Sequence, residues 1–184
     1  MTLLFTPVDI QLDNLVDYTR PSTLKKVAPS LAVPDWWDTV VLDQPSLLRF
    51  ENIIKQLPYD NLLVVRHKFQ NAPVGIHVDV NHYMKTISPE ELASIQDSEP
   101  CGYRVVINGK PDALEIFDGA NWIAPVLPTM PCCYLINSTR LQHRVKDDPG
   151  REILYFRGIV NKERNQQLIK RSLEKYKDHA VYLK

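Results

Sequence analysis

The sequence lacks both the excess of positive charge that binds nucleic acid and the long apolar segment that crosses a membrane. Lysine plus arginine and aspartate plus glutamate each number 22, so the formal net charge is zero. The class of non-specific nucleic-acid binders, which need a cationic surplus, is therefore disfavoured. No apolar run approaches the roughly 18 residues that span a bilayer, so we expect no membrane partner. The first residues lack a basic region followed by a long apolar core, so we also expect no signal peptide.

Cysteine and glycine are scarce as well. The three cysteines, Cys101, Cys132 and Cys133, form an odd set with an adjacent pair, which is a poor disulfide framework and fits no zinc motif. We predict that they are buried thiols of a protein in the reducing cytoplasm. Six glycines against 14 prolines indicate many stiff turns and few flexible ones.

The length of 184 residues suits a single domain. We expect residues 1–60 to provide irregular and helical support, residues 61–160 to form a β core, and residues 161–184 to form a C-terminal helix. Apolar spacing and a following proline predict a helix over Ser46–Leu57, with Ser46 as its N-cap. A capping box predicts a second, short helix from Ser88 to about Gln96.

Alternating apolar residues and turn dipeptides predict many short strands in the centre of the chain. The predicted strands cover residues 61–69, 74–80, 103–107, 113–117, 122–127, 132–136, 141–145 and 151–160, with a further short strand at 39–42. Helices before and after such a run predict an α+β fold with a double-stranded, jelly-roll core. The pattern leaves one alternative open, a meandering sheet with one helical layer.

Two of the five histidines lie in patterns that indicate metal ligands. Residues i and i+2 of a strand face the same side, so His77 and Asp79 present a nitrogen and a carboxylate oxygen together. His143 follows several strands later, and strands distant in sequence lie side by side in a closed double sheet. Two histidines and one carboxylate on one face of an ion favour non-heme Fe(II), and zinc also accepts these ligands.

A basic residue follows the second histidine across a strong turn signal. Arg151 lies eight residues after His143, and alternation places Arg151, Tyr155 and Arg157 on one face of the next strand. If that face is the interior, the buried guanidinium of Arg151 needs an anionic partner. Its parallel N–H groups can bond both oxygens of a carboxylate. A dicarboxylate co-substrate that also binds the metal fits this requirement. For Arg157 the pattern favours a solvated side chain.

Two other histidines are alternative ligands. His82 follows Asp79 by three residues, so His77, Asp79 and His82 form an alternative local cluster. His67 lies on a predicted neighbouring strand and is an alternative to His143.

The segment from about Val74 to Ile159 resembles the catalytic core of the Fe(II)- and 2-oxoglutarate-dependent oxygenases. That family has a double-stranded β-helix with a His-x-Asp/Glu pair, a distant His, and an Arg or Lys further along. His77 and Asp79 match the pair, His143 matches the distant His, and Arg151 matches the basic residue. Residues 133–145 resemble the family's apolar strand, its small polar turn, and the His followed by Val.

The resemblance implies a ligand set and a set of co-substrates. Fe(II) would be held by His77, Asp79 and His143, and 2-oxoglutarate would chelate the metal and pair its distal carboxylate with Arg151. O2 would be the oxidant. The double-stranded β-helix resembles that of aspartyl/asparaginyl or prolyl hydroxylases. In the aspartyl/asparaginyl branch a Tyr-Arg or similar pair opens the strand after the first ligands. Tyr103 and Arg104 are therefore candidates for co-substrate binding, and alternation lets only one of them face inward.

The implied activity is hydroxylation of a C–H bond in an amino-acid, peptide or small-molecule substrate. No catalytic residue is expected beyond the metal ligands, and Trp122 and Tyr155 are candidate residues of the substrate pocket. Two other classes stay open: a cupin-type metalloenzyme that does not use 2-oxoglutarate, and a non-enzymatic binding module on the same barrel. The first 60 residues resemble no family, and they leave the substrate open.

Overall fold

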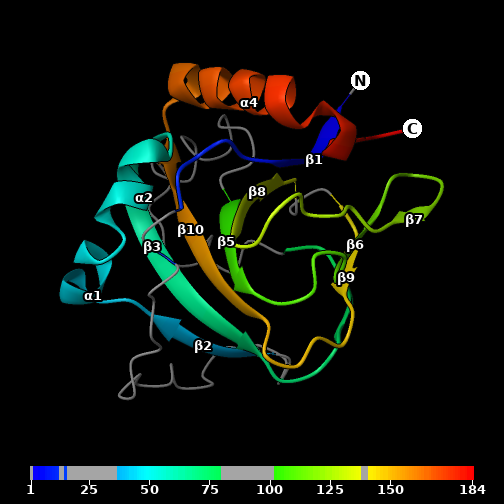
Figure 1. Ribbon diagram of the computed structural model, residues 1–184, viewed down its shortest axis with the longest axis horizontal. Coiled ribbons are helices and arrows are strands. Elements are labelled where there is room, and N and C mark those ends of the chain that lie inside the picture. The colour runs from blue at the N-terminus through cyan, green and yellow to red at the C-terminus, as the bar shows by residue number, and fades with distance from the viewer. Residues whose placement is uncertain (1, 13–14, 16–36, 80–101, 138–140) are drawn as a thin grey trace, which may run out of the picture.

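The computed structural model describes residues 2–12, 15, 37–79, 102–137 and 141–184. Within these residues the fold is α+β, with two antiparallel sheets and a group of helices. β5 (Gly102–Asn108) and β10 (Glu152–Val160) run side by side through the middle of the molecule (Figure 1). The predicted helix at Ser88–Gln96 and the third cysteine, Cys101, lie outside the described residues.

The larger sheet has seven strands, and β5 and β10 are central in it. Their order is β11 (Val181–Tyr182), β1 (Leu3–Pro7), β8 (Cys132–Ile136), β5, β10, β3 (Tyr59–Gln70) and β2 (Trp37–Val41). β11 closes onto β1, so the two ends of the chain lie close together (Figure 1).

The smaller sheet has four strands and carries both histidines of interest. Their order is β4 (Val74–His77), β9 (His143–Val145), β6 (Leu114–Phe117) and β7 (Trp122–Ile123). The helices are α1 (Gln44–Leu48), α2 (Glu51–Gln56), α4 (Lys162–Tyr176) and a 3-10 turn at Lys177–His179.

One hydrophobic core fills the space between the helices and the larger sheet. Strand alternation puts one set of apolar side chains of the larger sheet on this side, including Tyr103, Val105 and Leu135. They pack with Phe50 and Ile53 of the α1–α2 segment and with neighbouring apolar residues of α4. This side of the sheet is therefore closed by helices, and the other side is left for the second sheet.

A second core lies between the two sheets. The opposite face of the larger sheet contributes Val106, Tyr134 and Ile153, and the smaller sheet contributes Ile116 and Val145. Residues paired across antiparallel strands share a face, so the register places His143, opposite Ile116, on this inner face too. The sheets thus enclose an interior into which polar side chains of both sheets project.

Most predicted strands are present within the described residues, and the N-terminal helix differs from its prediction. The segment expected as one helix over Ser46–Leu57 forms α1 and α2, which are interrupted at Arg49 and Phe50. The N-cap is Asp43, whose side chain accepts a hydrogen bond from the backbone N–H of Ser46 at 3.0 Å, because the helix begins before Pro45.

The strands at both ends of the chain, β1 and β11, were not predicted. The predicted burial of the adjacent thiols is confirmed, because Cys132 is 4% and Cys133 1% exposed. Among the helices of the described chain, none combines the length and apolar character required to cross a bilayer.

Candidate metal centre

His77 and His143 come from neighbouring strands of the smaller sheet. His77 is the last residue of β4 and pairs in register with His143, the first residue of β9. Their ring centroids lie 4.1 Å apart at an interplanar angle of 49°. Strand pairing therefore brings together two imidazoles that are far apart in the sequence.

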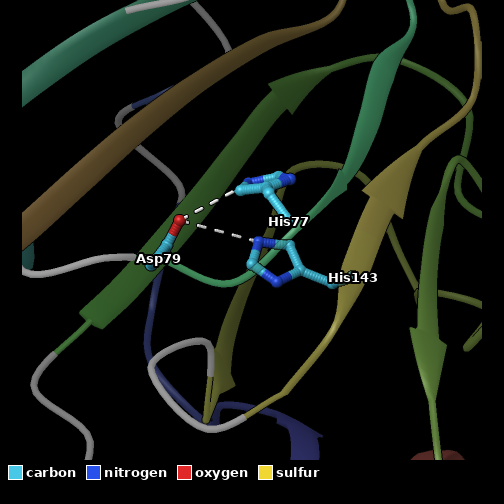
Figure 2. Close-up of side chains that lie close together, drawn as sticks. All are labelled: His77, Asp79 and His143. Atoms are coloured by element: carbon cyan, nitrogen blue, oxygen red, sulfur yellow. Dashed lines mark ion pairs between the residues drawn. The ribbon is translucent and has the colours of Figure 1, made fainter.

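Asp79 lies two residues beyond the end of β4 and turns back toward both rings. Figure 2 shows its carboxylate to one side of the two imidazoles and facing both, with Oδ1 3.5 Å from Nε2 of His77 and 3.7 Å from Nε2 of His143. One ligand atom from each residue lies within 4.8 Å of the others. A metal ion with bonds of about 2.1 Å at right angles spaces its ligand atoms about 3 Å apart. Small side-chain movements would therefore let His77, Asp79 and His143, here called the triad, bind one ion.

Both imidazoles are oriented by a hydrogen bond at Nδ1, which turns Nε2 toward Asp79. Nδ1 of His77 lies 2.8 Å from the carbonyl oxygen of Gly75, and Nδ1 of His143 lies 3.1 Å from that of Leu141. A carbonyl only accepts, so each Nδ1 carries a proton and donates it, and each Nε2 is the ring nitrogen directed at Asp79. A backbone carbonyl in this position is a common partner of metal-ligating histidine.

The three side chains differ in exposure, and the burial of His143 affects its charge. The His143 side chain is 6% exposed, whereas those of His77 and Asp79 are 27% and 26% exposed. Burial lowers the pKa of His143 to about 4, against the opposing attraction of the Asp79 carboxylate. His143 is therefore neutral at physiological pH, the state that a metal requires.

Of the Tyr103–Arg104 pair, only Arg104 faces the triad. The guanidinium Nη2 of Arg104 donates to Oδ2 of Asp79 at 2.5 Å. Tyr103 points to the opposite side of β5, where its hydroxyl donates to Asn165 of α4 within the helix-side core. The proposal of Tyr103 as a co-substrate ligand is therefore wrong, because strand alternation directs it away from the site.

Arg151 lies between the sheets in the same small cavity as the triad. This cavity has a volume of about 40 Å³. It is lined by Lys68, Val74, His77, Asp79, Arg104, Leu114, Tyr134, Ile136, His143, Val145, Arg151 and Ile153. Arg151 is 2% exposed, its Nη1 donates to the carbonyl of Lys110 at 3.3 Å, and it lies 3.6 Å from Asp148 Oδ2. Its Nε has no hydrogen-bond partner in the described part of the chain.

The two candidate pocket aromatics have different positions. Tyr155 lies on the inner face of β10, with Arg104 4.8 Å and Lys68 5.4 Å from its ring centroid. Trp122 lies on the outer face of the smaller sheet, where Arg144 stacks on it at 4.5 Å. Trp122 is thus on the side of the sheet away from His143, and its proposed place in the pocket is wrong.

The remaining sequence candidates also lie away from the triad. His67 is fully buried on the helix side of β3, where its Nε2 lies 2.6 Å from Glu152, so it is not an alternative to His143. Arg157 is 7% exposed and not solvated as predicted, because the inner face of β10 is covered. His82 lies outside the described residues.

Two of the polar residues that line the cavity were not singled out from the sequence. Lys68 projects from β3, and desolvation lowers its pKa to about 8. Tyr134 projects from β8, opposite Arg104 in register. The alternation of Asn61–Phe69 could have placed Lys68 inside, but Tyr134 stands in a run buried on both faces, where alternation gives no signal.

A larger groove, open to solvent and of about 740 Å³, lies near α4 and β1, and contains none of the predicted site residues. Its cations Arg171 and Lys175 are both bonded to the carboxylate of Asp9, at 3.1 and 2.6 Å. Such ion pairs are typical of a charged, solvated helix surface.

No protein-family model matches this chain, and a comparison with curated proteins finds no significant match. The family resemblance therefore stays a prediction, and the geometry of the candidate metal centre carries the functional argument.

Proposed function

We propose that this chain is an Fe(II)- and 2-oxoglutarate-dependent dioxygenase that hydroxylates a C–H bond of an amino-acid, peptide or small-molecule substrate. The proposal includes a double-stranded β-helix as the arrangement of its two sheets. The observation that carries it is the convergence of His77, Asp79 and His143 in one cavity with the buried guanidinium of Arg151.

The donor set fits Fe(II). Two imidazole nitrogens and one carboxylate oxygen meet from one side, and a two-His, one-carboxylate set of this kind leaves positions open for a co-substrate and O2. When bound, Fe(II) and 2-oxoglutarate supply the chemistry: one atom of O2 enters succinate as CO2 is released, and the other enters the substrate as a hydroxyl.

Arg151 fits the distal carboxylate of 2-oxoglutarate. Its guanidinium is buried in the cavity wall, and its Nε lacks a partner within the described residues. A buried, under-satisfied guanidinium stabilises a carboxylate strongly, because charge-assisted bonds are stronger in a dry site. Lys68 adds a second cation to the lining, so the cavity suits a dianion.

Apolar side chains form part of the cavity wall around His143 and Arg151, the two most buried polar groups of the site. Val74 and Val145 of the smaller sheet and Ile136 and Ile153 of the larger one surround the polar groups. Exclusion of water strengthens each ion pair and protects reactive species from side reactions. The protein's own contribution is thus to hold the ligands, to orient the co-substrate through Arg151, and to exclude water.

The proposal is tested by anaerobic titration of Fe(II) and then 2-oxoglutarate into metal-free protein. We expect one equivalent of Fe(II) to bind, and a weak visible charge-transfer band to appear when 2-oxoglutarate is added. Arg151→Lys keeps the positive charge but cannot bond both oxygens of a carboxylate at once. We therefore expect the 2-oxoglutarate concentration at half-saturation to rise about tenfold and the Fe(II) affinity to stay unchanged. Absence of the band in the wild-type protein would contradict the use of 2-oxoglutarate.

One observation favours a second candidate, a cupin-type metalloenzyme that uses no 2-oxo acid. Asp148 already lies 3.6 Å from Nη1 of Arg151, and the cavity of about 40 Å³ is small. In that case Arg151 is a structural cation, and Fe(II) binds without the charge-transfer band. A non-enzymatic binding module is distinguished by the absence of stoichiometric metal binding.

A further inference from the structure

Arg104 connects the larger sheet to the carboxylate of the metal triad. It belongs to β5, and its Nη2 donates to Oδ2 of Asp79 at 2.5 Å. The other oxygen, Oδ1, is the one that lies 3.5 and 3.7 Å from the two Nε2 atoms. The two oxygens of Asp79 thus have separate partners, a guanidinium on one side and the imidazoles on the other.

Asp79 needs such a contact more than the two histidines do. His77 and His143 each belong to a strand, and the backbone carbonyl two residues earlier fixes each ring. Asp79 lies beyond the last residue of β4, so no strand pairing orients its carboxylate. A guanidinium on the facing sheet supplies the orientation that the backbone does not.

Arg104 is itself held firmly. β5 is flanked by β8 and β10, and Tyr155 pairs with Arg104 across the β5–β10 ladder, with its ring centroid 4.8 Å from the guanidinium carbon. A Cβ at Gly102 would lie 3.2 Å from the Tyr155 ring, closer than side chains usually pack, and 3.4 Å from Nη1 of Arg104, in van der Waals contact. The arginine is therefore confined between an aromatic ring and Asp79.

We propose that Arg104 is a positioning residue for the metal: it holds Oδ2 of Asp79, so that Oδ1 alone is presented to the ion. This inference rests on the proposed metal site. It assigns Arg104 to the metal ligand rather than to the 2-oxoglutarate carboxylate. Hydrogen-bond partners of metal ligands usually contribute 10-fold to 100-fold to metal affinity.

The test is a titration of the full chain with Co(II), whose visible absorption reports coordination geometry. In Arg104→Met, which removes the donor, we expect Co(II) affinity to fall about 10-fold to 100-fold and the absorption spectrum to change. Arg104→Lys should bind Co(II) more tightly than Arg104→Met but less tightly than the wild-type protein. It keeps the positive charge, but it loses the planar guanidinium that stacks on Tyr155.

Arg144→Met is the matched control. Arg144 forms an equivalent ion pair, with its Nε 2.7 Å from Glu115, next to His143 in the sequence but on the outer face of the same sheet. It should bind Co(II) within about twofold of the wild-type protein. If Arg104→Met does not fold, Tyr155→Leu removes the stacking ring and leaves the donor, and it should weaken Co(II) binding to a smaller extent.

The outcomes separate this inference from the proposed function. If the wild-type protein binds Co(II) and the Arg104 variants bind it equally well or more tightly, the metal site stands and the positioning role is overturned. Arg104 would then only balance the charge of Asp79 in the empty site. If the wild-type protein binds neither Co(II) nor Fe(II), both the proposed function and this inference are overturned. A weakened variant with an altered spectrum supports the positioning role and the metal site on which it rests.

Discussion

His143 on β9 stands directly opposite His77 on β4, and the centroids of the two rings lie 4.1 Å apart. The candidate metal centre therefore depends on the register of two short strands. Because side chains alternate along a strand, a slip of one residue would turn His143 to the outer face, where Arg144 now lies. Val145 pairs with both Val74 and Leu114, and an irregularity of the ladder between Val74 and His77 brings His77 opposite His143.

Loss of either imidazole should abolish stoichiometric metal binding. His77→Ala and His143→Ala each remove one of three convergent donors, so Fe(II) affinity should fall by more than the roughly 100-fold typical of changes around a ligand. Anaerobic titration calorimetry measures the effect. His179→Ala, which removes a histidine bonded to the carbonyl of Val126 away from the site, should bind Fe(II) as the wild-type protein does. Equal affinity in all three variants would place the metal elsewhere.

The metal-free protein should lose stability as the pH falls from about 6.5 to 4. Burial lowers the pKa of His143 from 6.5 in an unfolded chain to about 4 in the folded protein. As pH falls through this window, the unfolded chain takes up the proton first, so the free energy of unfolding decreases. Between pH 7 and 4.5 the contribution of His143 is about 2 kcal/mol, at 1.36 kcal/mol per pKa unit.

Other groups titrate in the same range, so the measurement is a comparison. Urea unfolding of the wild-type protein and of His143→Gln, both with chelator present, should give curves that converge toward low pH. The wild-type protein loses about 2 kcal/mol more than the variant over this window. Parallel curves would show that the folded protein holds His143 with an ordinary pKa.

The sequence predicted the members of the triad because their spacing is local or chemically distinctive. The rule that residues i and i+2 share a strand face predicted that His77 and Asp79 would converge, although Asp79 lies just beyond β4 and reaches the site through a turn of the chain. Arg151 was a candidate on the condition that its strand face is interior, and it is 2% exposed. The choice of His143 and Arg151 rested on the family resemblance as well as on alternation and charge.

The sequence failed where neither alternation nor charge identifies a face. β7 has only two residues, too few to show a period, so Trp122 was assigned to the pocket although it lies on the outer face. Tyr134 lies in a strand of five buried residues, in which both faces look alike. The contact between Arg104 and Asp79 joins two sheets, and no local pattern encodes it.

Replacement of Trp122 should leave the candidate site intact. Its ring packs against Phe117 and Arg144 on the outer face, so Trp122→Leu should cost about 1 kcal/mol of stability through the lost ring contacts. Fe(II) affinity and the response to 2-oxoglutarate should match those of the wild-type protein. A large rise in the 2-oxoglutarate concentration required would show that the outer face takes part in binding.

Substitution of Gly109 should disturb Arg151 from outside the cavity. Gly109 has a φ of +136°, and a Cβ there would lie 2.6 Å from Asp148 Oδ2 and 3.0 Å from Cγ of Arg151. Gly109→Ala should therefore both strain the backbone, by roughly 1–3 kcal/mol, and displace the guanidinium. Thermal unfolding measures the first effect, and the 2-oxoglutarate titration of the Fe(II) protein should show the second as weaker binding.

The control for this prediction is Gly119→Ala. Gly119 has a φ of +99°, but the nearest atoms to its Cβ would be 3.3 Å away on Leu183 and 3.5 Å away on Lys184, remote from Arg151. It should show the backbone cost without a change in 2-oxoglutarate binding. Because the two variants share the strain and differ in the contact with Arg151, a difference in co-substrate affinity reports the position of that guanidinium. Equal affinities would mean that 2-oxoglutarate does not bind to Arg151.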